Sequence, residues 1–432
     1  MKSDQVLRAA WDELIADLQA ARDAIDDPAL HPPPPSDRNL AAGYRYLLGF
    51  VYSTIGRVLG DPLFPEFRRA IEPLAKSTID NADAVYLCAP IDGNHSYVLR
   101  GGAAAGRKAP HYVIFETPSG YVGDSGSIAE LRPGTRANGG VLDSSKLEVD
   151  SEGRFEILFA PERPAGHAGN FIGTKAVRRG VEFISRWIVL RELFHDWERE
   201  APLDLELVRV GSEGAHPAPL DPETAAAQLR RVGALVRNQV RYWNEFYAVT
   251  LETYADQNGD GKRFMPRNDL NPPNPGVAFG GQATNIYAGG VFELAPDEAL
   301  LVEVTVPVEP AYSGFHVSNL WGESLDFANH QSSLNGYQAE TDADGVQRYI
   351  VAHADPGVAN WIDTTGLPEG FLSLRWSYSE KPDALPTARV VKLPFGEVRA
   401  SLPANTRSVS AEERRERIRI RQAHVQRRYR HH

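Results

Sequence analysis

The residues best suited to chemistry lie in the carboxy-terminal third of the chain. Asp326, His330 and Asp363 are the candidate proton donors and acceptors, and Arg375 is the candidate clamp for an anionic group. Proton transfer needs an imidazole or carboxylate whose pKa is shifted by burial or by a neighbouring charge, and a guanidinium holds an anion through paired hydrogen bonds. These residue types predict acid–base catalysis in which one of the two aspartates is the base and the histidine is the acid.

Side chains that hold polar ligands are interspersed with this catalytic set. Indole rings cover apolar or sugar-ring surfaces, and side-chain amides hydrogen-bond to hydroxyl groups. The predicted substrate-binding residues are His316, Asn319, Trp321, Asn335, Gln338, Asp355 and Trp361. We expect the candidates to line one recess that takes a small polar or glycan-like ligand, with at least two carboxyl or imidazole groups within about 10 Å of each other.

The same residues also have a structural interpretation. Asp363 in NWIDTTG is suited to capping a turn, Arg375 to pairing with Asp355 across strands, and Asn335 to tying a loop to the backbone. Structural ion-pair networks gather charged residues as active sites do. The alternative function is therefore a non-catalytic protein that holds a carbohydrate or a lipid-like molecule in a groove lined by the two tryptophans.

A calcium-loop pattern lies further upstream but is incomplete. Asp256, Asn258, Asp260 and Gly261 match the start of such a loop, whereas its twelfth position is Arg267 instead of a bidentate glutamate. A solvated turn is the favoured interpretation. We predict no bound metal.

Three other motifs carry little chemical signal. His195 with Asp196 and Glu198 lacks the spacing that places two imidazoles on one helix face, and His167 lies in a Gly-rich loop without phosphate-loop spacing. Cys88, the single cysteine, is expected to be a small buried residue. The chain contains no Gly-x-Ser-x-Gly elbow, P-loop or nicotinamide fingerprint, so we predict no cofactor.

Composition limits the partners. The chain has 432 residues, 42% of them hydrophobic, which is enough for two or three packed units. Its formal net charge of −11 disfavours a general nucleic-acid binder, which needs a surplus of Lys and Arg. Neither a signal peptide nor a membrane-length apolar stretch is visible in the sequence. We expect a cytoplasmic protein without nucleic-acid or membrane partners, and leave a homo-oligomer open.

Apolar periodicity predicts helices at the amino terminus. Leu7, Trp11, Leu14 and Leu18 recur at helical steps, with Ser3 available as the cap. A polyproline spacer at 32–35 separates this helix from a second one over about 40–60. A third helix is predicted over 62–76.

Short apolar segments between turn residues predict strands in two series. The first series covers residues 84–91, 96–101, 111–117, 146–150 and 155–160, and the second covers residues 285–294, 299–308, 315–321, 348–354, 371–378 and 388–393. A strand leading into a short helix near Trp197 is expected at 181–200. No internal repeat is evident.

Two further helices complete the prediction. Apolar residues from Leu229 to Trp243 share one face of a long helix, and Ser410 with Glu413 forms a capping box that opens an arginine-rich terminal helix. We expect the terminal helix to lie on the acidic body with its charges solvated, and regard phosphate binding as the weaker alternative.

The predicted fold class is α+β. A helical amino-terminal section precedes two antiparallel β-sandwich or jelly-roll-like units, with a long helix between them and a basic helix at the end. The expected boundaries are 1–80 for the helical section, 81–200 for the first β unit, 201–255 for the helical segment, 256–400 for the second β unit with the site, and 401–432 for the terminal helix.

Several phrases are similar to a known bacterial family. GYRYLLGF, NADAVYLCAPIDGNHSYVLRG, LRELFHDWERE, DPGVANWIDTTG and LSLRW resemble the family catalogued as domain of unknown function 1214, with an amino-terminal part like its companion domain 1254. Asn81, Ala82 and Asp83 stand where such families often have Asn-Pro-Asp, which alters the turn. The resemblance implies a helical section with jelly-roll-like units, and it implies no reaction. The function expected from the residues is a metal-independent hydrolase, lyase or isomerase.

Overall fold

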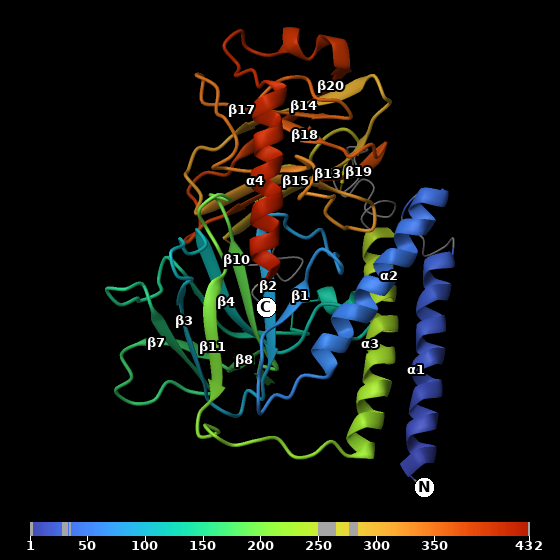
Figure 1. The fold of residues 1–432 in the computed structure, drawn as a ribbon, viewed down its shortest axis with the longest axis vertical. Coiled ribbons are helices and arrows are strands. Elements are labelled where there is room, and N and C mark those ends of the chain that lie inside the picture. The colour runs from blue at the N-terminus through green and yellow to red at the C-terminus, as the bar shows by residue number, and fades with distance from the viewer. Residues whose placement is uncertain are drawn as a thin grey trace.

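Figure 1 shows a computed structural model with helices along one side of two stacked β units. It describes residues 3–27, 33, 36–132, 134–248, 265–275 and 284–430. The calcium-like pattern at 256–261 lies outside the described residues. The mixed α+β class, with mostly β-sheet, is confirmed, as are the helical amino-terminal section and the terminal helix.

Three helices form the helical layer. They are α1 (Ser3–Asp26), α2 (Asp37–Val58) and α3 (Pro222–Ala248), and α1 runs beside α3 (Figure 1). Ser36 caps α2 because its Oγ accepts a hydrogen bond from the backbone N–H of Asn39. The three helices share an apolar core that includes Leu14, Ile25, Phe50, Val236 and Val240.

The third predicted amino-terminal helix is absent. Its residues form β1 (Arg68–Ile71), which pairs antiparallel with β2. Pro65 and Pro73 flank the strand at a separation too short for a stable helix, and proline in a helix interior removes a hydrogen bond.

The first β unit contains two main sheets and a hairpin. The five-stranded sheet has the order β1, β2 (Ala84–Pro90), β10 (Trp187–Leu193), β4 (Tyr112–Pro118), β5 (Asn138–Asp143). The four-stranded sheet has the order β11 (Leu203–Arg209), β3 (Tyr97–Ala103), β6 (Phe155–Ala160), β7 (Asn170–Gly173), and the hairpin pairs β8 (Lys175–Arg178) with β9 (Val181–Ile184). Side chains of both main sheets enter one core.

Two predictions for this unit are wrong because aspartates turn the chain. The predicted strand at 146–150 does not form; the segment leads into a turn where the Asp150 carboxylate accepts backbone N–H groups of Glu152 and Arg154. Near Trp197 the expected helix is also a turn, because Asp196 accepts the N–H of Glu198. Sequence patterns missed β5, β7, β8 and β11, and β1 and β11 are edge strands of the two main sheets.

The second β unit again contains two sheets over one core. The five-stranded sheet has the order β12 (Asn274–Pro275), β13 (Asn285–Glu293), β19 (Glu369–Ser377), β15 (Tyr312–Ser318), β16 (Ser333–Asn335). The four-stranded sheet has the order β18 (Trp361–Asp363), β17 (Gln347–Ala352), β14 (Glu298–Thr305), β20 (Thr387–Pro394). Their shared core includes Phe292, Leu300, Phe315, Val351 and Leu374.

Both β units repeat one strand arrangement. Strands β1, β2, β10, β4 and β5 correspond in order and direction to β12, β13, β19, β15 and β16. The four-stranded sheets correspond equally, down to their one parallel pair, β6 with β7 and β17 with β18. Sequence inspection missed this repeat because strand order depends on apolar alternation and turn positions, which differing residues satisfy.

Helix α4 (Ala411–Arg430) runs along both units (Figure 1). Its predicted capping box is confirmed by reciprocal hydrogen bonds between Ser410 and Glu413. The expectation of solvated charges fails for Arg414, Arg421 and Arg428, which recur every seven residues on one stripe and are buried.

Short 3₁₀ helices lie at Ile128–Leu131, Phe395–Glu397 and Arg399–Ser401. Within the described ranges, every helix is too short or too polar to cross a bilayer.

Candidate functional site

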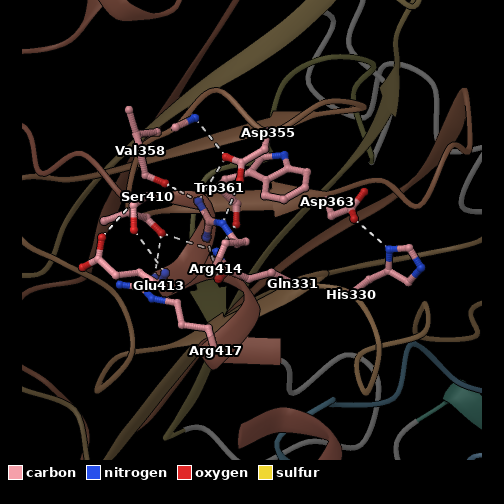
Figure 2. A network of polar contacts seen from close by, with 12 residues as sticks. His330, Gln331, Asp355, Val358, Trp361, Asp363, Ser410, Glu413, Arg414 and Arg417 are labelled. Carbon is pink, nitrogen blue, oxygen red and sulfur yellow. Dashed lines mark hydrogen bonds and ion pairs between the residues drawn. The ribbon is translucent and has the colours of Figure 1, made fainter. Parts of the chain in front are cut away.

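The site predicted in the carboxy-terminal third centres on an imidazole–carboxylate pair. His330 Nδ1 lies 2.8 Å from Asp363 Oδ2, and the two side chains face each other in Figure 2. The imidazole is 43% exposed, whereas the carboxylate is 12% exposed. Asp363 Oδ1 accepts the backbone N–H of Thr365, so the carboxylate is held from both sides.

The local backbone explains why this pair forms. Asp363 ends β18, and its N–H donates to the carbonyl of Gln331, next to the histidine. His330 donates its N–H to the carbonyl of Asp326 in a tight turn. Thr365 has a φ of 54°, a left-handed conformation that costs a non-glycine residue free energy. The strained turn after β18 thus delivers its N–H to the Asp363 carboxylate.

Asp326 begins the turn that carries His330, and its carboxylate accepts hydrogen bonds from the side chain and backbone N–H of Asn329. Burial raises its pKa, but hydrogen bonds from the Asn329 side chain and backbone, with the charges of Lys76 and His330, outweigh burial and lower the pKa overall. Asp326 is therefore ionised at neutral pH and is a poor proton donor.

The remaining candidates do not converge on this pair. Asp355 and Trp361 instead anchor α4, as Figure 2 shows. Arg414 donates to both oxygens of Asp355, at 2.9 and 3.1 Å, and to Gln331 Oε1 at 2.7 Å. The guanidinium also lies over the Trp361 ring, 5.1 Å from its centroid. Asp355 therefore has a structural role, but it anchors α4 through Arg414 and does not pair with Arg375 across strands.

Arg375 and His316 lie between the two β units. Arg375 donates to the carbonyl of Ile79 at 2.8 Å, and its Nη2 lies 3.2 Å from His316 Nε2. Burial and then the Arg375 charge lower the pKa of His316 well below its ordinary value. A neutral imidazole accepting from a guanidinium holds the interface together, and Arg375 is not placed as a clamp beside His330.

Asn335 also belongs to this interface. Its Nδ2 donates to Asp83 Oδ1 at 3.0 Å and to the carbonyl of Phe194 at 2.9 Å, and Asn335 is fully buried. Gln338 supports the same turn, because its Oε1 accepts the backbone N–H of Asn335. Both amides are committed to the fold.

The Trp321 indole is buried against helix α2. Its Nε1 donates to the carbonyl of Asn39 at 2.8 Å, and its ring lies 5.3 Å from that of Tyr46. Asn319 shapes the preceding turn by accepting N–H bonds from Trp321 and Glu323. With Trp361 also buried, the expected groove lined by two tryptophans does not form.

Sequence inspection missed a titratable cluster near Asp326. Burial raises the pKa of Glu323 to about 7, against opposing effects of Asn319 and Lys76. Lys76 donates to the carbonyls of Ser324 and Leu325, and burial lowers its pKa. Asp80 binds the Ser324 hydroxyl and N–H. Because these contacts join residues about 245 apart in the chain, no local pattern signals them.

Three cavities in the described part of the chain lie away from the predicted site, and none of the predicted site residues lines them. A cavity of about 890 Å³ covers the outer face of β3, β6 and β11, between Arg100 and Glu206. Cavities of about 540 and 660 Å³ adjoin near β9 and share Ile184 and Arg186. No group of three or more metal-binding side chains is found in the described ranges.

Comparison with known proteins identifies the fold and no activity. Neither protein-family models nor curated proteins yield a match. A crystal structure of an uncharacterised protein from Burkholderia cenocepacia is 26% identical, with a TM-score of 0.74, and the match covers 91% of this chain and 99% of that one. A protein from Vibrio parahaemolyticus is 12% identical with a TM-score of 0.42, over 87% and 100% of the two chains.

Proposed function

We propose that the chain is an enzyme that transfers protons at His330, with Asp363 orienting the imidazole. The observation that carries this proposal is the 2.8 Å contact of an exposed imidazole with a shielded carboxylate. Asp363 Oδ2 accepts a hydrogen bond from Nδ1–H, which leaves the Nε2 lone pair available to a ligand. His330 then acts first as base and returns the proton as acid.

Two carboxylates lie where they stabilise His330 while it holds the transferred proton. When Nε2 takes a proton, the imidazolium is stabilised by the negative charge of Asp363, which it contacts, and by that of Asp326. The reaction class is hydrolysis, elimination or isomerisation of a small polar or glycan-like substrate, without a metal. The binding alternative loses its main support, since both tryptophans are buried.

The test compares substrate conversion by matched variants. Wild type and His330→Gln are incubated with a mixture of glycosides, sugar acids and hydroxy acids, and products are identified by mass spectrometry. We expect wild-type products that fall by a factor of about 10² to 10⁴ with the variant, the usual contribution of general acid–base catalysis.

His216→Gln is the control, because His216 is exposed and lies outside this region. Products formed equally by wild type and His330→Gln would contradict the proposal. Stabilisation of the protein by a compound that stays unchanged would favour the binding alternative.

The finer architecture, family and location are also proposed. Two sheets over each core support β-sandwich units of jelly-roll type. The phrases quoted above support membership of the family named there, and the composition supports a cytoplasmic location. Proteolysis, a family-level sequence alignment and cell fractionation test these three points respectively.

We further propose a homo-oligomer that pairs through α2. Six large apolar residues are exposed along this helix and at its C-cap, each at least 40% accessible: Leu40, Tyr44, Leu48, Tyr52, Ile55 and Leu59. They span about 28 Å at 1.5 Å per residue, so two antiparallel copies bury matching stripes about a two-fold axis. Light scattering should give a dimer that Leu48→Glu dissociates. A wild-type monomer would contradict this pairing.

A further inference from the structure

A second binding site lies in the first β unit, in the cavity of about 540 Å³ at the carboxyl end of α2. Its walls come from α2, α3 and the segments beside β2 and β10. This volume is within the range of small-molecule sites. Three arginines, Arg57, Arg186 and Arg231, line it with a single acidic residue, Asp92.

Two of the arginines are available to a ligand. Arg186 and Arg231 are exposed, and in the described part of the chain neither guanidinium has a hydrogen bond or an ion pair. The cavity is thus lined by more basic than acidic residues, on a chain with a formal net charge of −11. Free, convergent guanidinium groups bind phosphate and carboxylate oxygens in pairs.

The third arginine is built into the wall. The Arg57 side chain is 7% exposed and lies over the Tyr121 ring, 4.8 Å from its centroid. Its nearest carboxylate, that of Asp124, is 3.5 Å away and already accepts a hydrogen bond from Gln239 at 2.9 Å. The positive charge of Arg57 is therefore only partly compensated.

The other walls suit an organic body with hydroxyl groups. Pro62, Pro90, Ile91 and Trp187 provide apolar surface. Asp92 Oδ1 accepts two hydrogen bonds from Asn94, and its Oδ2 remains an acceptor for a hydroxyl group. We propose that this cavity binds a small hydroxylated molecule that carries a phosphate or carboxylate group. This binding is independent of the proton transfer at His330.

The repeated fold supplies a second argument. The segment from β7 to β10, which contributes Ile184 and Arg186 to the cavity, is the counterpart of the segment from β18 to β19. That second segment begins directly after Asp363. The cavity and the His330–Asp363 pair thus occupy equivalent ends of two copies of one strand arrangement, where loops are free to carry function.

Calorimetry on the full chain tests the proposal with three probes: glucose 6-phosphate, gluconate and neutral glucose, at constant low ionic strength. We expect saturable binding of at least one anion, and none of glucose. Arg186→Ala with Arg231→Ala should weaken the anion at least about tenfold, because each removes charge-assisted bonds. The phosphate and carboxylate arms identify which group is preferred.

Arg241→Ala is the matched control, since Arg241 is exposed on the same helix and pairs with Glu245 outside the cavity. It should bind as wild type does. The proposal is overturned by any of three results: no saturable anion binding below about 10 mM, equal binding of glucose, or a double variant within about twofold of wild type.

Discussion

Glu192 shows how one buried residue sets a pH dependence. It follows Ile188 and Leu190 on the inner face of β10 and is fully buried, with its Oε1 accepting the N–H of Leu203 at 2.9 Å. Burial raises its pKa to about 8, against smaller opposing effects of that hydrogen bond and of two arginines. The folded protein thus holds a proton that the unfolded chain releases above about pH 4.5.

The wild-type protein should therefore lose folding stability at high pH, and Glu192→Gln should not. The neutral carboxyl contributes fully below pH 4.5, and its contribution disappears as pH rises through about 8. The amide keeps an oxygen for Leu203, so at pH 8.5 we expect the variant to be more stable by roughly 2–4 kcal/mol, and the difference to vanish near pH 5. Chemical denaturation at both pH values measures this, with exposed Glu206→Gln as control; a difference independent of pH would contradict it.

Helix α4 depends on buried arginines. Arg414 is buried where it bonds Asp355, Gln331 and the carbonyl of Val358, whereas Arg415 beside it is exposed. Removing one partner of such a pair leaves an uncompensated carboxylate and amide.

Arg414→Ala should destabilise the fold by about 2–4 kcal/mol, less than a fully buried pair because Asp355 is 34% exposed. Arg415→Ala should change stability by less than about 0.5 kcal/mol. Urea unfolding of both variants measures the difference. Similar losses for both would mean that the helix contributes only generic packing.

At the scale of elements, periodicity predicted much of the fold. Helices α1 and α3 follow from apolar spacing and α4 from its capping box, and most strands follow from β-branched runs. The failures have local causes, such as the prolines around β1 and the Asp150 turn. For the site, residue types were enough to name His330 and Asp363. The burial of Trp321 depends on Asn39, 282 residues away, which no local pattern contains.

At the scale of the molecule, Asp83 connects the two β units. Its carboxylate accepts hydrogen bonds from Trp197 at 3.0 Å in the first unit, and from Asn335 at 3.0 Å and Tyr312 at 2.6 Å in the second. All four side chains are buried. In an amide one of these oxygens becomes an NH₂ group, so one donor loses its charged acceptor; if that donor is Tyr312, its hydroxyl has to turn to Asn81 Oδ1, 3.1 Å away.

Asp83→Asn should thus weaken the coupling between the units. We expect a loss of about 2–4 kcal/mol and a broadened or two-step thermal transition, where wild type shows one. Scanning calorimetry provides the measurement, and Asp204→Asn, on the exposed side of β11, is the control. An unchanged single transition would show that the units are coupled elsewhere.

The state of the His330 imidazole tests the central claim most directly. Asp363 Oδ1 bonds the N–H of Thr365, so in Asp363→Asn the amide oxygen should stay there and the NH₂ group should face Nδ1. The proton then moves from Nδ1 to Nε2, which removes the free base. Nitrogen-15 spectra of the side chain should show a protonated Nδ1 in wild type and a protonated Nε2 in the variant. A wild-type Nε2 proton, or identical spectra, would contradict the account.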